Sequence, residues 1–145
     1  MIRIVEHEEL DTLAGLGAEF FDKLNLPGKF DRHVFIEYWA KLISSKAGFI
    51  IGRFIENDPV EAIGAVVYPD MQTGELTSCT TFWYVTAGAG LAAGMLEAAL
   101  RSHWQFLGVR HCFVSVLCNE RLDNVSGFLI RSGYRLAEMQ FRKEI

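Results

Sequence analysis

The chain of 145 residues is half hydrophobic and 22% charged, and it carries a formal net charge of −4. This length and composition predict one globular domain over residues 1–145 and exclude wholesale disorder. The net charge is slightly acidic and the sequence has no stripe of basic residues, so we expect no nucleic-acid partner.

The first third of the chain predicts a strand and two helices. Residues 2–5 are typical of a short strand. Residues 7–26 carry apolar side chains at helical spacing, and the Pro-Gly pair that follows ends this helix. Asp31 stands where an N-cap would begin a second helix, which we expect to run to about Ser45.

Three strands and a glycine-rich turn come next. Residues 48–55 and 60–68 are apolar runs separated by the turn sequence Glu-Asn-Asp-Pro, which predicts an antiparallel hairpin. A second turn leads into residues 76–85, where threonine and aromatic side chains favour a strand. The turn at residues 86–90 then opens a long run of helix-forming residues, 91–107.

The last third predicts a strand, a short helix and a final strand. Residues 111–118 follow a helical crossover and should therefore lie parallel to the strand before the glycine turn. Asp123 or Asn124 would cap the short helix, Gly133 would end it, and residues 134–142 would form the final strand. This order predicts a mixed α/β sheet of about six to seven strands, with a central parallel pair and helices on both faces.

The cysteines and histidines predict neither a disulfide framework nor a metal site. The three cysteines lack a CxxC motif and lie in or beside apolar runs, so we expect reduced thiols. The four histidines show no i, i+4 pair. Because the amino-terminal residues also lack the order of an export signal, we expect a cytoplasmic protein.

The strand–turn–helix segment carries the clearest chemical signal. Residues 76–96 contain no charge, but five hydroxyl residues and three glycines argue against a membrane span. A helix that begins after glycines presents unpaired backbone N–H groups in a positive field, at Gly88, Ala89 and Gly90. Such a turn can bind a phosphate or pyrophosphate.

Two other interpretations of this turn stay open. The spacing Gly88-x-Gly90-x-x-x-Gly94, with Glu120 after the next strand, suggests a dinucleotide fold. Only 25 residues follow Glu120, however, which is too few for the rest of a doubly wound sheet. The turn could also be a purely structural connection between strand and helix.

The order of elements and two local motifs resemble the GNAT superfamily of N-acetyltransferases. That family opens its long helix with Gln/Arg-x-x-Gly-x-Gly/Ala, and here Val85 stands at the Gln/Arg position, followed by Gly88 and Gly90. Near its end the family shows a short helix and then a Gly-aromatic pair, here Gly133 and Tyr134. The likeness spans nearly the whole chain.

The resemblance implies that acetyl-CoA is the co-substrate. Its pyrophosphate would lie on the amides of the glycine turn, and its pantetheine arm would pair with the end of the preceding strand like an extra strand. The implied contacts are Tyr84, Val85, Thr86, Gly88, Ala89, Gly90 and Asn119. An alternative register moves the pantetheine contacts to Thr80 and Thr81.

The implied activity is transfer of the acetyl group to a primary amine of a small molecule or protein, by direct attack on the thioester. Glu75 is the candidate base and Tyr84 the candidate donor to the leaving thiolate. A solvated turn carboxylate and packing against Trp83 are their structural alternatives. Phe30, Phe35 and Trp39 are candidate walls of the acceptor pocket, and the apolar composition is compatible with a homodimer.

Two departures from the family pattern support a different function. Val85 removes a polar side chain near the pyrophosphate, and Leu129 stands where the family often has a tyrosine that acts as general acid. A GNAT-fold module without catalysis, which binds an acyl-CoA or another protein, is therefore the alternative. An unrelated small α/β binding domain is the third hypothesis.

Overall fold

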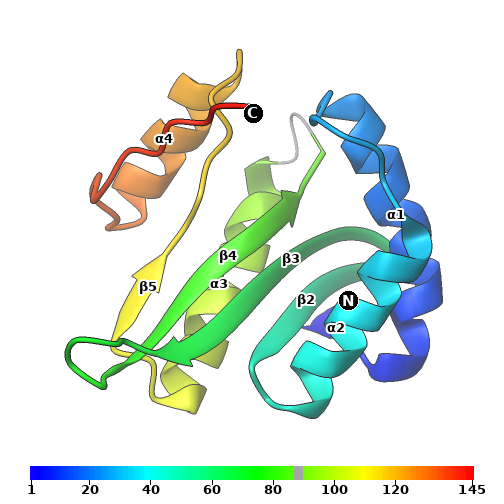
Figure 1. Ribbon diagram of the computed structural model, residues 1–145, viewed down its shortest axis with the longest axis horizontal. Coiled ribbons are helices and arrows are strands. Elements are labelled where there is room, and N and C mark those ends of the chain that lie inside the picture. Colours follow the sequence, from blue (N-terminus) through cyan, green and yellow to red (C-terminus); the bar gives the residue numbers. More distant parts are fainter. Residues whose placement is uncertain (87–89) are drawn as a thin grey trace. The chain divides into compact units, whose positions relative to one another are not determined.

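The computed structural model describes residues 1–86 and 90–145 (Figure 1). Two compact units make up these residues, Met1–Ser115 and Val116–Ile145. The prediction of one domain over the whole chain stays a prediction. In the described residues, no helix is both long enough and apolar enough to cross a bilayer.

The first unit contains a five-stranded sheet in the order β1-β2-β3-β4-β5. The strands are β1 (Ile2–Ile4), β2 (Gly48–Ile55), β3 (Asp58–Pro69), β4 (Leu76–Tyr84) and β5 (His111–Phe113). Neighbouring strands are antiparallel except β4 and β5, which are parallel. The predicted hairpin, the mixed sheet and its parallel pair are confirmed, but the pair lies at the edge of the described sheet rather than at its centre, because β5 is the last strand in the order.

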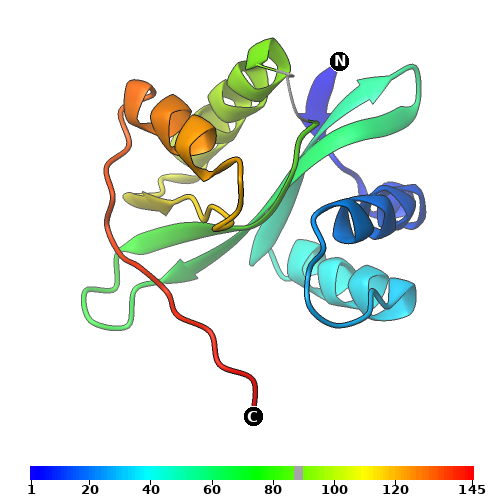
Figure 2. The same cartoon turned by 90° about the horizontal axis from the view of Figure 1, so that it is seen from above.

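Helices cover both faces of this sheet, as predicted. They are the 3-10 turn η1 (His7–Glu9), α1 (Leu10–Lys23), α2 (Arg32–Ser44) and α3 (Gly90–Leu107). Figure 2 shows α1 and α2 on one side of the sheet and α3 on the other. Asp31 caps α2 as predicted, because its carboxylate accepts a hydrogen bond from the backbone N–H of Val34 at 3.1 Å.

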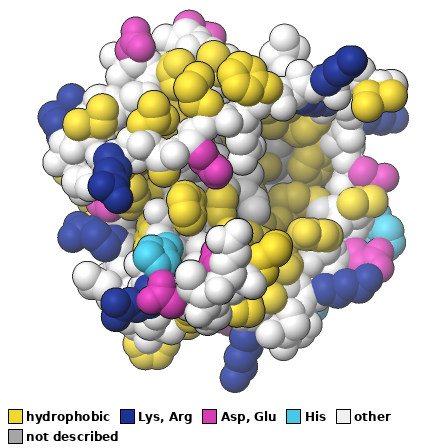
Figure 3. All heavy atoms as spheres, turned by 60° about the vertical axis from the view of Figure 1, so that its left-hand side comes forward, with side chains coloured by type: hydrophobic (Ala, Val, Ile, Leu, Met, Phe, Trp, Pro, Cys, Tyr) yellow, Lys and Arg dark blue, Asp and Glu magenta, His cyan; other side chains and the backbone are white. Residues whose placement is uncertain are grey.

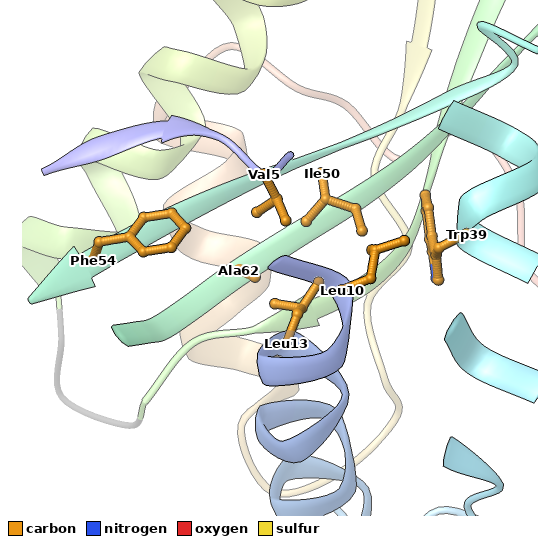
Figure 4. Packing of buried hydrophobic residues seen from close by; sticks show 7 residues of the cluster. All are labelled: Val5, Leu10, Leu13, Trp39, Ile50, Phe54 and Ala62. Carbon is orange, nitrogen blue, oxygen red and sulfur yellow. The ribbon is translucent and has the colours of Figure 1, made fainter. Parts of the chain in front are cut away.

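The core under α1 and α2 is a cluster of buried side chains from both helices and the sheet (Figure 4). Its members are Val5, Leu10, Leu13, Trp39, Ile50, Phe54 and Ala62. Two glycines let aromatic rings lie directly on the strands. A Cβ atom on Gly52 would stand 2.7 Å from the ring of Phe54, and one on Gly64 would stand 2.3 Å from the ring of Phe82. Both glycines are therefore required by close packing.

The parallel pairing of β4 with β5 is shorter than the sequence predicted. It comprises three residue pairs, from Thr77↔His111 to Cys79↔Phe113. The predicted strand over residues 111–118 is therefore wrong beyond Phe113. At Ser115 the backbone N–H donates to the side-chain oxygen Oγ1 of Thr80 at 3.0 Å, so a hydroxyl group takes the place of a strand carbonyl.

The second unit contains α4 (Leu122–Arg131) and a carboxyl-terminal segment without strand structure. Arg121 is the N-cap of α4, so neither Asp123 nor Asn124 caps it. Gly133, with φ of 96°, follows the end of the helix as predicted.

The predicted final strand over residues 134–142 is wrong, and the sheet formed by the described residues has five strands rather than six to seven. The apolar side chains of this segment are exposed: Leu136 by 82% and Phe141 by 90%. Apolar residues are insufficient by themselves, because a strand also needs a partner to satisfy its backbone.

The two glycine environments give a test of the packing. We expect Gly64→Ala to lower the free energy of unfolding by about 1–3 kcal/mol, because the new methyl group would displace the ring of Phe82. We expect Gly94→Ala, in α3 with no described atom within 4 Å of its Cβ position, to raise it by about 0.5–1 kcal/mol. Urea denaturation measures both values. A neutral or stabilising Gly64→Ala would contradict the packing described.

Candidate functional site

The carboxyl end of β4 brings several predicted site residues together. Tyr84 is the last residue of β4, Val85 is buried behind it, Thr86 is exposed, and α3 begins at Gly90. The predicted residues Gly88 and Ala89 lie outside the described residues. Tyr84, Val85, Thr86 and Gly90 therefore mark the passage from β4 to α3.

A β-bulge interrupts β4 at Thr81. On β3, Gly64 pairs with Phe82 while its neighbour Ala65 pairs with Thr80, which leaves Thr81 as an extra residue. The hydroxyl group of Thr81 donates to the carbonyl oxygen of Gly64 at 3.3 Å. The bulge lies two residues beyond Cys79, the last residue of β4 that pairs with β5. Irregular pairing on both edges of β4 thus coincides at Thr80 and Thr81, the residues of the alternative register.

Tyr84 is buried in an aromatic stack. Its ring lies 4.2 Å from that of Phe82 and 5.3 Å from that of Phe20, both in stacked orientation. The predicted alternative, packing against Trp83, is wrong because successive strand residues point to opposite faces. The residue is only 6% exposed, and this burial raises the pKa of Tyr84 to about 12.

The three predicted pocket walls belong to the same aromatic cluster. Phe35 and Trp39 contact Phe82, with ring centroids 6.0 and 5.4 Å apart, and Phe30 contacts Phe35 at 5.5 Å. Trp39 is buried, whereas Phe30 and Phe35 are partly exposed. Phe30 and Phe35 are therefore the two of these side chains that a bound molecule could reach more readily.

Glu75 lies at the other end of β4. It precedes Leu76, the first of nine β4 residues, and Tyr84 is the last. At roughly 3.3 Å per residue, this strand separates the two by nearly 30 Å. Its carboxylate oxygen Oε2 instead contacts His111 Nε2 at 2.5 Å. The structure therefore does not bring the predicted base together with Tyr84 and Thr86. The prediction failed because it left out the length of the extended strand between them.

Asn119 belongs to the second unit, where it organises the turn before α4. Its side-chain oxygen accepts the backbone N–H of Arg121 at 3.0 Å, and its carbonyl oxygen accepts the N–H of Leu122 at 3.0 Å. This is the local turn geometry that asparagine favours. A cofactor contact of Asn119 stays a prediction.

One buried carboxylate at the end of β4 was missed by the sequence analysis. Glu61 on β3 is 0% exposed. Its oxygen Oε2 accepts a hydrogen bond from Arg53 Nε at 2.5 Å, and Oε1 accepts the backbone N–H of Thr86 at 3.1 Å. The available signal was a charged residue in each of two apolar strands, Arg53 and Glu61, which the hairpin register places opposite each other.

The described residues contain no group of three or more His, Cys, Asp or Glu side chains that could hold a metal ion. The cysteines Cys79, Cys112 and Cys118 are free, and burial raises the pKa of the Cys112 thiol, which favours its unreactive protonated form. On the face shown in Figure 3, Lys and Arg side chains are interspersed with acidic and hydrophobic ones rather than gathered in a basic patch.

Comparisons with known proteins relate this chain to solved structures. No protein-family model matches it, and no curated protein matches it. A probable acetyltransferase superimposes with a TM-score of 0.79, at 14% identity, over 100% of this chain and 97% of that chain. A predicted acetyltransferase from Clostridium acetobutylicum, solved with acetyl-CoA, gives a TM-score of 0.76 at 12% identity, over 99% and 95%.

An aminoglycoside acetyltransferase from an uncultured soil metagenomic sample, in complex with sisomicin, gives a TM-score of 0.72. Its identity is 16%, over 100% of this chain and 93% of that chain. At these identities the likeness shows the fold. The three solved structures share it across nearly the whole length of the chain.

The burial of Tyr84 predicts a loss of stability in alkali. The phenol is held neutral in the folded state, so its contribution is complete below pH 10, its ordinary pKa, and is lost as the pH rises toward 12. We expect the wild type to lose up to about 2–3 kcal/mol more than Tyr84→Phe over this window. Denaturation at several pH values measures the difference. The control Tyr38→Phe removes an exposed phenol and should lose stability with pH as the wild type does. An equal loss of stability in the wild type and in Tyr84→Phe would contradict the prediction.

Proposed function

We propose that this chain, which has the GNAT-like fold predicted from its sequence, is an N-acetyltransferase. It transfers an acetyl group from acetyl-CoA to a primary amine of a small molecule or protein by direct attack. One observation carries the proposal: in a chain of this fold, β4 bulges at Thr81, loses its partner β5 after Cys79 and leads through a glycine turn into α3.

The glycine turn would hold the pyrophosphate. α3 is 18 residues long, and the N-terminus of such a helix attracts anions through its dipole and its unpaired amides. Gly88, Ala89 and Gly90 would supply those amides. Val85 lacks the polar side chain that the family places nearby, so we expect weaker binding than with a Gln or Arg there.

The pantetheine arm would lie along β4 beyond the point where β5 stops pairing. Thr80 and Thr81 start this stretch, and Tyr84, Val85 and Thr86 end it. An extended arm can pair with such an edge as an added strand. Because the N–H of Thr86 is donated to Glu61, a ligand contact at Thr86 would use its carbonyl or hydroxyl group.

The ammonium first loses a proton to solvent water, because Glu75 lies at the far end of β4, and the free amine then attacks the thioester carbon. The N–C bond forms, the C–S bond breaks, and the second proton lost by the nitrogen ends on the departing thiolate, through water, as the thiol of CoA. Tyr84 would donate a hydrogen bond to the departing thiolate. Complete proton transfer from it would be uphill, since the pKa of Tyr84 is about 12, well above that of a thiol such as cysteine, about 8.5.

The acceptor is proposed to be a cationic amine with an apolar part. The chain has a net charge of −4, which favours cations at long range. Phe30 and Phe35, partly exposed on the α1–α2 side, offer apolar contacts. A neighbour of this fold, an aminoglycoside acetyltransferase in complex with sisomicin, supports the proposal of a small-molecule acceptor.

A module that binds acyl-CoA without catalysis is the second candidate. Val85 and Leu129 replace two polar residues of the family pattern, and Leu129 is 7% exposed, as expected of a packing residue. Binding of acetyl-CoA without turnover of any amine would favour this candidate.

Titration with acetyl-CoA tests the site. We expect micromolar binding by calorimetry, and at least about tenfold weaker binding by Gly90→Glu, because a carboxylate there repels the pyrophosphate. A side chain fits at this exposed position, since no described atom lies within 4 Å of its Cβ position. The control Ala98→Glu adds the same charge at an exposed position two turns along α3 and should bind normally. Equal affinity of the Gly90 variant and the wild type would exclude the site.

Turnover separates Glu75 from Tyr84. Once an acceptor is found, Glu75→Gln should keep kcat within about twofold, since the residue lies at the far end of β4. Tyr84→Phe should lower kcat about tenfold or more through loss of a hydrogen bond to a charged atom. Steady-state kinetics with saturating acetyl-CoA measures both values. A large loss in Glu75→Gln with an unchanged Tyr84→Phe would reverse the assignment.

A further inference from the structure

A row of three residues crosses the sheet where β4 ends. Arg53 on β2 and Glu61 on β3 are register partners, and Thr86 follows β4 by two residues. The Glu61 carboxylate joins the other two: Oε2 accepts from Arg53 Nε at 2.5 Å and Oε1 accepts from the Thr86 backbone N–H at 3.1 Å. The row thus connects two core strands to the chain that leaves β4 for α3.

Glu61 has no access to a substrate. It is 0% exposed and each carboxylate oxygen has a protein donor, whereas Arg53 keeps part of its side chain, 29%, in contact with solvent. A carboxylate with these partners is not a group that exchanges protons with an acceptor amine. Its chemistry is to hold two donors in fixed positions.

The carboxylate acts where the backbone ladder has already stopped. The pairing of β3 with β4 ends at Ala62 and Tyr84, although β3 begins four residues earlier, at Asp58. The N–H of Thr86 therefore lies beyond the ladder, and the side chain of Glu61 supplies the acceptor that a strand carbonyl would otherwise provide. This bond fixes the path of the chain immediately before the glycine turn.

We propose that Glu61, oriented by Arg53, is a positioning residue for the acetyl-CoA site. By holding the Thr86 amide it fixes where the end of β4, with the Thr86 carbonyl and hydroxyl groups, meets the cofactor. This inference rests on the proposed function. It assigns the pair a role in affinity rather than in stability alone, since buried ion pairs are often replaceable by apolar residues without loss of stability.

Glu61→Gln tests the proposal by calorimetric titration with acetyl-CoA, well below the melting temperature. Glutamine keeps the size of the side chain, but its NH2 group must face either the Arg53 or the Thr86 donor, so one of the two hydrogen bonds is lost. We expect about tenfold weaker binding, the effect of one charge-assisted hydrogen bond.

The matched control is Glu9→Gln. It breaks the Arg3–Glu9 ion pair, also 2.5 Å long, between β1 and η1. The melting temperature should fall in this variant while the Kd for acetyl-CoA stays within about twofold of the wild type. A role of Glu61 in stability alone would give Glu61→Gln the same behaviour as this control, and that result would overturn the proposal.

Thr86→Pro provides a second route if Glu61→Gln does not fold. Proline removes the backbone donor and the hydroxyl group at this position and leaves the Arg53–Glu61 pair intact. Thr86→Ala, which loses the hydroxyl but keeps the N–H, is therefore the reference for its affinity. We expect binding about tenfold weaker, in the direction of Glu61→Gln. Binding by Thr86→Pro within about twofold of that by Thr86→Ala would overturn the proposal. Failure of the wild type itself to bind acetyl-CoA would overturn the proposed function as well.

Discussion

β4 is hydrogen-bonded to β3 along its length, except at Thr81, but to β5 over only three residue pairs. This unequal pairing is the constraint on which the candidate site depends. Beyond Cys79 the backbone must find other partners, and side chains supply them: the Thr80 hydroxyl accepts Ser115 N–H, and Glu61 accepts Thr86 N–H. The hydroxyl groups of Thr80 and Thr81 thus help to satisfy the irregular part of the ladder.

One face of β4 carries the aromatic side chains that connect the core to the candidate site. On the side of α1 and α2, Phe82 and Tyr84 continue an aromatic cluster from the core to the end of the strand. That cluster depends on Gly64, whose missing side chain lets the Phe82 ring lie on β3. The same contacts that stabilise the fold therefore hold the Tyr84 ring between Phe82 and Phe20 of α1, where its burial keeps the proton on the oxygen.

The sequence was sufficient wherever the structure is decided by neighbouring residues. Helical spacing predicted α1 and α2, the Asp31 side chain predicted the start of α2, and turn residues predicted the β2–β3 hairpin. The crossover through α3 predicted the parallel direction of β5. These features follow from local propensity, from capping and from the handedness of connections, all of which can be read along the chain.

Tertiary structure alone decided where the strands near the carboxyl terminus end and which partners the polar side chains contact. Residues 114–118 and 134–142 have strand-like patterns but no described strand, because a strand forms only where a partner satisfies its backbone. Glu75 was predicted to be the base because it comes directly before β4. The structure separates it from Tyr84, since the two residues lie at opposite ends of this extended strand. Glu61 gave no local sign of its role, since its partners Arg53 and Thr86 are 8 and 25 residues away along the chain. The sequence determined which elements form, and their pairing determined which residues meet, since contacts across a sheet depend on register and length.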